Sequence, residues 1–288
     1  KTAAFDATGI FIGNLGSVTT TVASGEIMTL TAAIANGKTI IGAGGVTVTS
    51  LSIDEYDGGS INISGTYKIQ AQGELNASTD LHPSDNTKTK PIIIPQAALK
   101  ATAAQLTGLV VNNGSNGASS ENVIITNLHS TLAADLSTIN TSGVHTAAFD
   151  TTGIFVGNLG SVTTTVGNGV TMTLTAVIAD GKTINGTGGT VAITDLHSTL
   201  GADLSGITAT TKTAAFDATG IFEGNLGSVT TTVAANKTMT LTAALANGKT
   251  IVGTGGTVDI TAGDVTKDAV LSGITTDISS YAATDGTI

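Results

Sequence analysis

The sequence predicts an all-β protein that winds into a parallel β-solenoid (a β-helix), and three observations lead to that prediction. An aspartate or asparagine followed four positions later by isoleucine or valine recurs at a regular, short interval. The chain is rich in threonine and glycine, and only 11% of its residues are charged. A longer repeat, three times the short interval, lies on top of the short one. A step that regular indicates one turn of a solenoid.

The short repeat sets the expected coil length at roughly 22 residues. Its polar members are Asn14, Asn36, Asp57, Asp135, Asn158, Asp180, Asp203, Asn225 and Asn247. Its apolar members are Val18, Ile40, Ile61, Ile139, Val162, Ile184, Ile207, Val229 and Ile251. We expect the apolar members to point inward and stack into a ladder. We expect the polar members to hydrogen-bond nearby backbone at coil corners, with a row of bound cations as the alternative.

The long repeat, of about 67 residues, groups three coils of different sequence. The segment TAAFDTTGIFVGNLGSVTTTV begins at Thr146 and returns from Thr213 as TAAFDATGIFEGNLGSVTTTV, and another copy begins at Thr2. Apolar residues alternate with threonine in segments such as MTLT, which is the period of a half-buried strand. Tandem β-sandwich domains of about 67 residues are the alternative fold. The shorter step inside each repeat argues against them.

The repeats divide the chain into three expected segments. Residues 1–64 form N-terminal solenoid coils, 65–111 form a non-repetitive excursion, and 112–288 form the main solenoid repeats. The excursion contains all three prolines (Pro83, Pro91 and Pro95), and we expect a short helix in it from Gln96 to Leu106. A long loop is usually functional or disordered, so this one either clasps a neighbouring subunit or decorates the surface.

Composition excludes several classes of protein. The net charge is −10 and arginine is absent, whereas nucleic acid and anionic membrane surfaces demand a basic footprint. The most apolar stretches, such as Pro91–Leu99, are about half the length that spans a bilayer, so we expect no membrane insertion. Absence of cysteine excludes a disulfide framework and a thiol nucleophile. Acidic, cysteine-free chains rich in Thr, Gly and Ala are common among secreted bacterial surface proteins, so we expect an extracellular or cell-surface location.

Catalytic motifs are absent from the sequence, and we expect no enzyme. The chain has no phosphate-binding loop and no nucleophile elbow. His129 and His197 lie in matching LHSTL segments, and repetition favours a structural role. A glycan-cleaving β-helix enzyme that uses Asp54 or Asp57 is the enzymatic alternative.

We expect no cofactor apart from Ca²⁺. The candidate metal ligands are Asp54, Glu55 and Asp57, with Asp80 or Asp85 as further ligands, because Ca²⁺ takes six to eight oxygens. A solvated acidic turn is the alternative.

Threonines occupy the two outward positions after many ladder residues. The pairs are Thr163 and Thr165, Asn185 and Thr187, Thr208 and Thr210, Thr230 and Thr232, and Val252 and Thr254. Stacked on consecutive coils, they would form a flat double rank that resembles the ice-binding face of some solenoid antifreeze proteins. The rank is interrupted at Ile41 and Ala43 and at Asn140 and Ser142. The structural alternative is that threonine, being β-branched and uncharged, suits exposed strands.

The motif runs TAAFDATGIF, GNLGSVTTTV, MTLTAAIANGKTI and LHSTL resemble the repeat arrays of giant bacterial surface proteins, which include solenoid adhesins and surface-layer-type structural proteins. The likeness covers Lys1–Leu51 and Asn122–Ile274. It implies a secreted, non-enzymatic scaffold with Ca²⁺ as a stabilising ion.

Self-association follows from the two ends of the sequence. The chain begins part-way through a coil and stops inside one, with no amphipathic cap at either end. We therefore expect coils to stack head to tail on another subunit or on more of the same polypeptide. The expected function is a rigid extracellular scaffold that assembles end to end into a filament, stalk or surface coat. An adhesin or ice-binding module that presents the threonine face to glycan or ice is the alternative.

Overall fold

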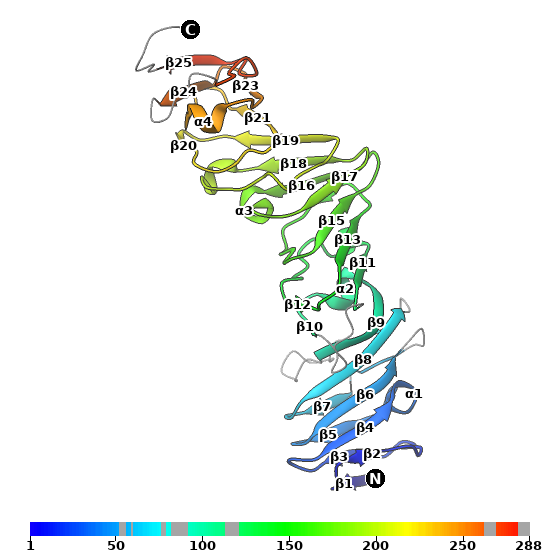
Figure 1. Ribbon diagram of the computed structural model, residues 1–288. Coiled ribbons are helices and arrows are strands. Elements are labelled where there is room, and N and C mark those ends of the chain that lie inside the picture. Colours follow the sequence, from blue (N-terminus) through cyan, green and yellow to red (C-terminus); the bar gives the residue numbers. More distant parts are fainter. Residues whose placement is uncertain are drawn as a thin grey trace. The chain divides into compact units, whose positions relative to one another are not determined.

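The protein is a parallel β-solenoid with coils of about 20 residues (Figure 1). The computed structural model describes residues 1–51, 56–58, 60–75, 79–81, 92–112, 121–261 and 269–281. The chain divides into two compact units, Lys1–Ala147 and Ala148–Ile288. Within each unit the described strands pair in parallel with strands of neighbouring coils, which confirms the predicted fold class. Tandem β-sandwiches, which are built from antiparallel sheets, are excluded.

Unit 1 stacks its strands in two main series. Its strands are β1 (Thr2–Phe5), β2 (Gly9–Ile10), β3 (Thr19–Val22), β4 (Ile27–Thr31), β5 (Ile40–Gly42), β6 (Gly45–Leu51), β7 (Ile61–Ile63), β8 (Tyr67–Glu74), β9 (Ile92–Thr102), β10 (Val110–Asn112), β11 (Val123–Thr126), β12 (Ile139–Asn140) and β13 (His145–Phe149), whose last residues belong to unit 2. Its helical turns are α1 (Ala32–Ala35), α2 (Ala103–Leu106) and the 3-10 turn η1 (Leu128–Thr131). One series runs β1-β3-β5-β7 and the other β2-β4-β6-β8-β9-β11-β13, while β10 pairs with β9 and β12.

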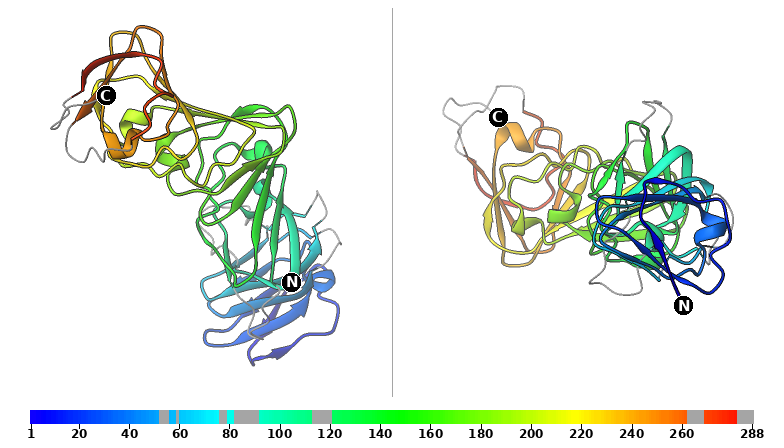
Figure 2. Two further views of the ribbon diagram at one scale, coloured as in Figure 1. Left: turned by 45° about the horizontal axis from the view of Figure 1, so that its top comes forward. Right: turned by 90° about the horizontal axis from the view of Figure 1, so that it is seen from below.

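Unit 2 has the same construction. Its strands are β14 (Gly153–Ile154), β15 (Thr163–Val166), β16 (Thr171–Thr175), β17 (Ile184–Gly186), β18 (Thr190–Thr194), β19 (Thr211–Phe216), β20 (Gly220–Ile221), β21 (Thr230–Val233), β22 (Thr238–Thr242), β23 (Ile251–Gly253), β24 (Thr257–Thr261) and β25 (Asp277–Tyr281). Its helical turns are α3 (Ala176–Ala179), η2 (Leu196–Ser198) and α4 (Ala243–Ala246). The series are β14-β16-β18-β19-β21-β23, β20-β22-β24-β25 and the pair β15-β17. Figure 2 gives two further views of these stacked strands.

The interior of each unit is a stack of aliphatic side chains, as the sequence predicts. The ladder residues Ile139, Val162, Ile184, Ile207, Val229 and Ile251 are each at most 2% exposed. The apolar residues of the MTLT segments in β4, β16 and β22 are also buried, and their threonines are half-buried. Hydrophobic burial therefore follows the period of two along these three strands.

The alignment of the ladder follows the prediction in part: Ile40 pairs with Ile61, Ile184 with Ile207 and Ile251 with Ile274. Other steps of the ladder differ. An even step from one corner to the next places Val162 beside Ile184, whereas the structure pairs Thr164 with Ile184. The same pairing recurs as Thr20 with Ile40 and Thr231 with Ile251. Coil length differs from one coil to the next. The partner of Ile184 in the preceding coil is Thr164, and its partner in the following coil is Ile207, which lies farther away along the chain. The spacing of the polar corners therefore predicts the register between some neighbouring coils and fails between others.

The described part of segment 65–111 continues the solenoid and does not leave it. Strand β8 pairs with β6 and β9, and β9 pairs with β11. The expected helix from Gln96 to Leu106 is wrong for most of its length, since residues 96–102 belong to β9 and only α2 is helical. Pro95 lies between the part of β9 that pairs with β10 and the part that pairs with β11, where its missing N–H removes no ladder bond on that side. Pro83 and Pro91 lie outside the described residues.

The one-turn helices close coil corners in a common way. Thr31 and Thr242 precede α1 and α4, and each hydroxyl accepts a hydrogen bond from the backbone N–H three residues on. After α3, Gly181 has a φ of 63°, in the left-handed region that glycine adopts at least cost. Its N–H donates to the Asp203 carbonyl of the next coil at 2.9 Å. The corner thus ends one turn and joins it to the next. Within the described residues, every helix is too short to cross a bilayer.

Candidate functional site

The column of asparagine and aspartate residues hydrogen-bonds backbone, as predicted. Asn158 Oδ1 accepts from the N–H of Gly160 at 3.0 Å, and Asn14, Asn225, Asp135 and Asp203 make the same contact two residues on. Asp180 Oδ1 instead accepts from the Asp203 N–H of the next coil at 2.8 Å, as Asn36 and Asn247 do with Asp57 and Val270. These oxygens serve the fold, which favours the backbone interpretation over a row of bound cations.

The hydrogen bonds of serine hydroxyls and amides stabilise the charged form of two of these carboxylates. Ser137 lowers the pKa of Asp135 through its side chain and its N–H, and Ser205 does the same to the pKa of Asp203. Asp203 is exposed and Asp135 is half-buried, and both carboxylates remain ionised at neutral pH. Their role is to hold corners, and they lack the raised pKa of a general acid.

The predicted Ca²⁺ cluster is only partly within the described residues. Asp54, Glu55 and Asp85 lie outside them. Asp57 is exposed, its backbone forms a parallel bridge with Asp80, and its N–H donates to Asn36 Oδ1 at 3.0 Å. The structure therefore places Asp57 and Asp80 in adjacent coils, and the Ca²⁺ site stays a prediction.

A shallow depression in unit 2 gathers three polar side chains that bond backbone. It is lined by Gly157, Asn158, Val177, Ile178, Asp180 and Lys182. The Lys182 ammonium donates to the Gly160 carbonyl of the preceding coil at 2.9 Å. Lys38 and Lys249 make the equivalent bond in their own repeats. The carboxylate, the amide and the ammonium that line the depression each bond backbone.

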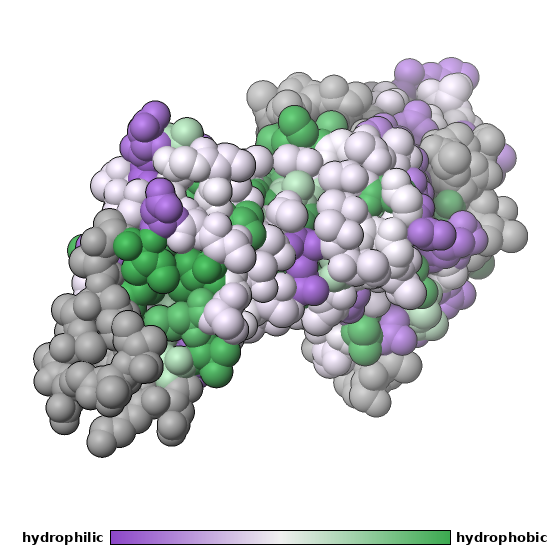
Figure 3. All heavy atoms as spheres, turned by 90° about the horizontal axis from the view of Figure 1, so that it is seen from above, coloured by the Kyte–Doolittle hydropathy of each residue, from purple (hydrophilic) through white to green (hydrophobic). Residues whose placement is uncertain are grey.

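The predicted rank of threonines faces outward, and two of its hydroxyls bond the neighbouring coil. Thr208 Oγ1 donates to Asn185 Oδ1 at 2.6 Å, and Thr210 Oγ1 bonds both the Gly186 carbonyl and the Gly188 N–H. Members of the predicted rank are half-buried or exposed, as expected. On the face drawn in Figure 3, residues of intermediate hydropathy predominate. The hydroxyls of Thr208 and Thr210 therefore contribute to coil stacking.

Two buried tyrosines form a polar contact in unit 1. The hydroxyls of Tyr56 and Tyr67 are 2.5 Å apart, and each residue is 1% exposed. Burial raises the pKa of both phenols above the ordinary value, because a phenolate loses its hydration there. The charge of Asp57 acts in the same direction. Both hydroxyls therefore stay protonated at neutral pH and act as a structural hydrogen-bonded pair.

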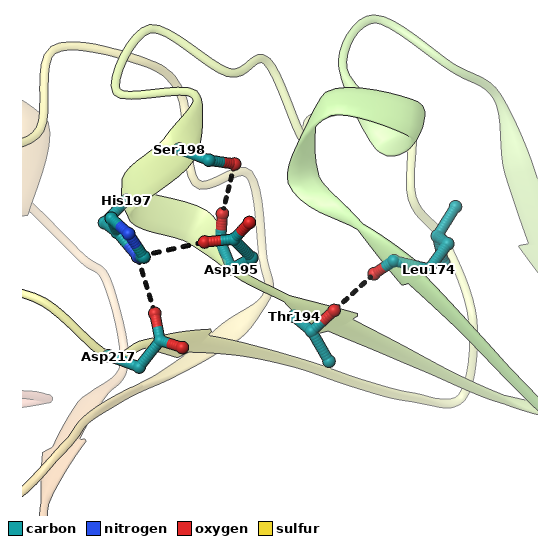
Figure 4. A network of polar contacts seen from close by, with 6 residues as sticks. All are labelled: Leu174, Thr194, Asp195, His197, Ser198 and Asp217. Carbon is teal, nitrogen blue, oxygen red and sulfur yellow. Dashed lines mark hydrogen bonds and ion pairs between the residues drawn. The ribbon is translucent and has the colours of Figure 1, made fainter. Parts of the chain in front are cut away.

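The structure brings together three residues that the sequence analysis did not group. Asp195 directly follows β18, His197 lies in η2, and Asp217 directly follows β19 (Figure 4). His197 Nδ1 is 2.6 Å from Asp217 Oδ1 and 3.1 Å from Asp195 Oδ1. Strands β18 and β19 are parallel neighbours, so the residues that follow the two strands meet at one edge of the sheet. A prediction of this pairing from the sequence would have grouped the three residues.

The outer face of the first coil is less buried than the same face in the two later copies. Ala3 is exposed, whereas its counterparts Ala147 and Ala214 are 2% and 1% exposed. Phe5 and Phe11 are half-buried, whereas their counterparts Phe149, Phe155, Phe216 and Phe222 are fully buried. In the later copies the covering residue is an isoleucine of a preceding strand, namely Ile125 beside Ala147 and Ile193 beside Ala214. Strand β1, which carries Ala3 and Phe5, stands at the end of its sheet series.

Comparisons with protein-family models, with curated proteins and with solved structures found no match for this chain.

Proposed function

We propose that this protein is a non-enzymatic extracellular scaffold whose coils stack end to end on those of another copy, building a filament, stalk or surface coat. The observation that carries the proposal is that successive coils join through parallel strand pairing. The first-coil face, defined by Ala3, Phe5 and Phe11, offers the same contact to a coil of another copy or of the same polypeptide. In both internal copies, the strand that carries the alanine pairs in parallel with a strand of the preceding coil, which sets Ile125 beside Ala147 and Ile193 beside Ala214. The same contacts between two chains would bury Ala3 and complete the open edge of β1.

The repeat itself identifies the strand that fits this face. The covering strands in the later copies are β11 and β18, which share the pattern Val-x-Ile-Thr. A third strand of this pattern is β24, with Val258 and Ile260. Strand β18 pairs with β19 of the following coil, and β24 pairs in the equivalent position with β25. The pairing of β24 with β25 shifts register after Val258. We propose that β1 of a second copy replaces β25 on β24.

The non-enzymatic and extracellular parts of the proposal have separate support. The polar groups of the depression in unit 2 and of the corner column bond backbone, which supports a structural role for them. The acidic, cysteine-free composition and the resemblance to bacterial surface repeat arrays support a location outside the cell. Protease treatment of intact source cells, followed by detection of this chain, tests that location.

Sedimentation velocity over a range of concentrations, with negative-stain imaging, tests the assembly. The full chain should form longer species as concentration rises, and Ala3→Lys should abolish them, because the ammonium would be buried at the contact. Ile10→Lys is the matched control on the same coil. Ile10 and its counterparts Ile154 and Ile221 are 75%, 60% and 57% exposed, so this position stays outside the contact in every copy.

A second variant tests the partner strand. Ile278→Pro removes a ladder donor from β25 and should raise the fraction of assembled protein by freeing β24. A chain that stays monomeric at every concentration contradicts the proposal. Assembly that persists in Ala3→Lys contradicts the role of the first-coil face.

Presentation of the threonine rank to glycan or ice remains a prediction that we do not adopt as the function. The hydroxyls of Thr208 and Thr210 are engaged with neighbouring coils. Thermal hysteresis that disappears in Thr208→Lys would nevertheless establish ice binding.

A further inference from the structure

We propose that Asp195, His197 and Asp217 form a binding site for one divalent cation of the Zn²⁺ class, which links two successive coils of unit 2. Asp195 and His197 belong to the coil of β18, and Asp217 belongs to the coil of β19. A cation held by all three would add a coordinate link to the parallel pairing of the two strands. The inference is independent of the assembly proposed above.

The spacing of the three ligand atoms fits a coordination sphere. His197 Nδ1 lies 2.6 and 3.1 Å from the two carboxylate oxygens, and all three atoms are within 4.8 Å of one another. With metal–ligand bonds of about 2.0–2.2 Å, neighbouring ligands of a tetrahedral or octahedral ion are roughly 3–3.5 Å apart. Small side-chain rotations therefore suffice to admit the ion.

The arrangement around His197 Nδ1 is better explained by a bound cation than by hydrogen bonds alone. Nδ1 carries at most one proton, whereas two carboxylate oxygens converge on it. One N–H cannot satisfy both acceptors with good geometry. A divalent ion at this point would coordinate the neutral Nδ1 lone pair and neutralise both carboxylates, displacing the shared proton to solvent.

The matching segment in unit 1 shows that the backbone here does not require Asp195. Asp195 has the left-handed backbone conformation, with φ of 58°, and its counterpart Asn127 has φ of 52°. Asparagine therefore makes the same turn before the same Leu-His-Ser segment. The carboxylate at position 195 adds a negative oxygen beside His197 that the turn itself does not need.

The donor set indicates which cation fits. One imidazole nitrogen and two carboxylate oxygens suit Zn²⁺ and neighbouring divalent ions such as Co²⁺, whereas Ca²⁺ prefers six to eight oxygens. The side chains of Asp195, His197 and Asp217 are 42%, 37% and 50% exposed. Water can thus reach the ion and complete its coordination.

Calorimetric titration of the untagged, EDTA-stripped full chain with ZnCl₂ tests the proposal, with Co²⁺ absorption as a spectroscopic readout of the ligand set. We expect saturable binding of one equivalent and an increase in Tm with Zn²⁺. His197→Ala and Asp217→Asn should weaken binding by more than the roughly 10- to 100-fold lost with an outer-shell partner. His129→Ala, the matched change in the other LHSTL segment, should leave the affinity unchanged.

Asp195→Asn keeps the proposal testable if a stronger variant fails to fold, because asparagine already occupies the equivalent turn at Asn127. We expect it to fold like the parent and to bind Zn²⁺ more weakly. Absence of saturable binding to the parent chain overturns the proposal. So does binding that is equal in parent and His197→Ala, which would mean adventitious ions only, or Ca²⁺ binding tighter than Zn²⁺.

Discussion

Thr164 lies beside Ile184 in the neighbouring coil, and its side chain faces the interior with a hydroxyl that has no hydrogen-bond partner among the described residues. Thr20 and Thr231 repeat this arrangement against Ile40 and Ile251. Each threonine is at most 2% exposed. Three equivalent hydroxyls are therefore buried in an aliphatic stack, where an unpaired polar group lowers stability.

Thr164→Val should stabilise the protein. Valine has nearly the same shape and removes the buried hydroxyl, so we expect the free energy of unfolding to rise by about 1–2 kcal/mol. Urea-induced unfolding followed by circular dichroism measures the change. Thr165→Val is the control, because Thr165 is exposed and its change should stay within about 0.5 kcal/mol. A destabilised Thr164→Val would show that the hydroxyl has a partner in solution.

Ile184→Lys should destabilise unit 2 strongly. Ile184 is fully buried between coils, and an ammonium there would lose its hydration without gaining a partner. We expect a loss of about 3–5 kcal/mol, measured as a lower Tm and a lower urea midpoint. Ile154→Lys, at a position 60% exposed in the same unit, should change stability by less than about 0.5 kcal/mol. Equal stability of Ile184→Lys and the parent would refute its inward orientation.

The sequence predicts coils and core better than it predicts register. The alternation in MTLT identifies the inward face, but the TTTV strands carry three threonines in a row, which do not show which side faces inward. Segment 96–106 is rich in helix formers, yet pairing with β8 and β11 overrides that propensity in β9. The Asp195, His197 and Asp217 cluster depends on the offset between β18 and β19, which sets Thr190 beside Thr211. That offset follows from unequal coils and cannot be deduced from the corner spacing.

Asp180 should contribute to stability through its oxygen and not through its charge. Its Oδ1 accepts the N–H of Asp203 in the next coil, and asparagine makes the same bond at Asn36 and Asn247. We expect Asp180→Ala to cost about 0.5–1.5 kcal/mol and Asp180→Asn to be neutral within about 0.5 kcal/mol. Thermal unfolding of the two variants in parallel separates the contributions. A large loss in Asp180→Asn would point to a bound cation at this corner instead.

The Tyr56 and Tyr67 pair should make unit 1 sensitive to alkaline pH. Both folded-state pKa values lie above the ordinary value of 10.0, so the folded state holds protons that the unfolded chain releases. The stability linked to these protons is fully present below about pH 10 and is lost as pH rises above it, by up to about 1.4 kcal/mol per pH unit for each phenol. Tyrosinate absorbance and circular dichroism, recorded together from pH 8 to 12, follow ionisation and unfolding.

Tyr281→Phe provides the background for this measurement, because it leaves only the buried pair among the three tyrosines. We expect its absorbance to rise together with loss of the folded signal, since the phenolates form only when burial ends. Adding Tyr67→Phe to this variant should roughly halve the stability that is lost per pH unit above pH 10. Ionisation of the lysines contributes equally to the single and the double variant, so it does not affect the comparison. Two phenols that ionise near pH 10 with the circular dichroism unchanged would mean that water reaches the pair in the folded protein.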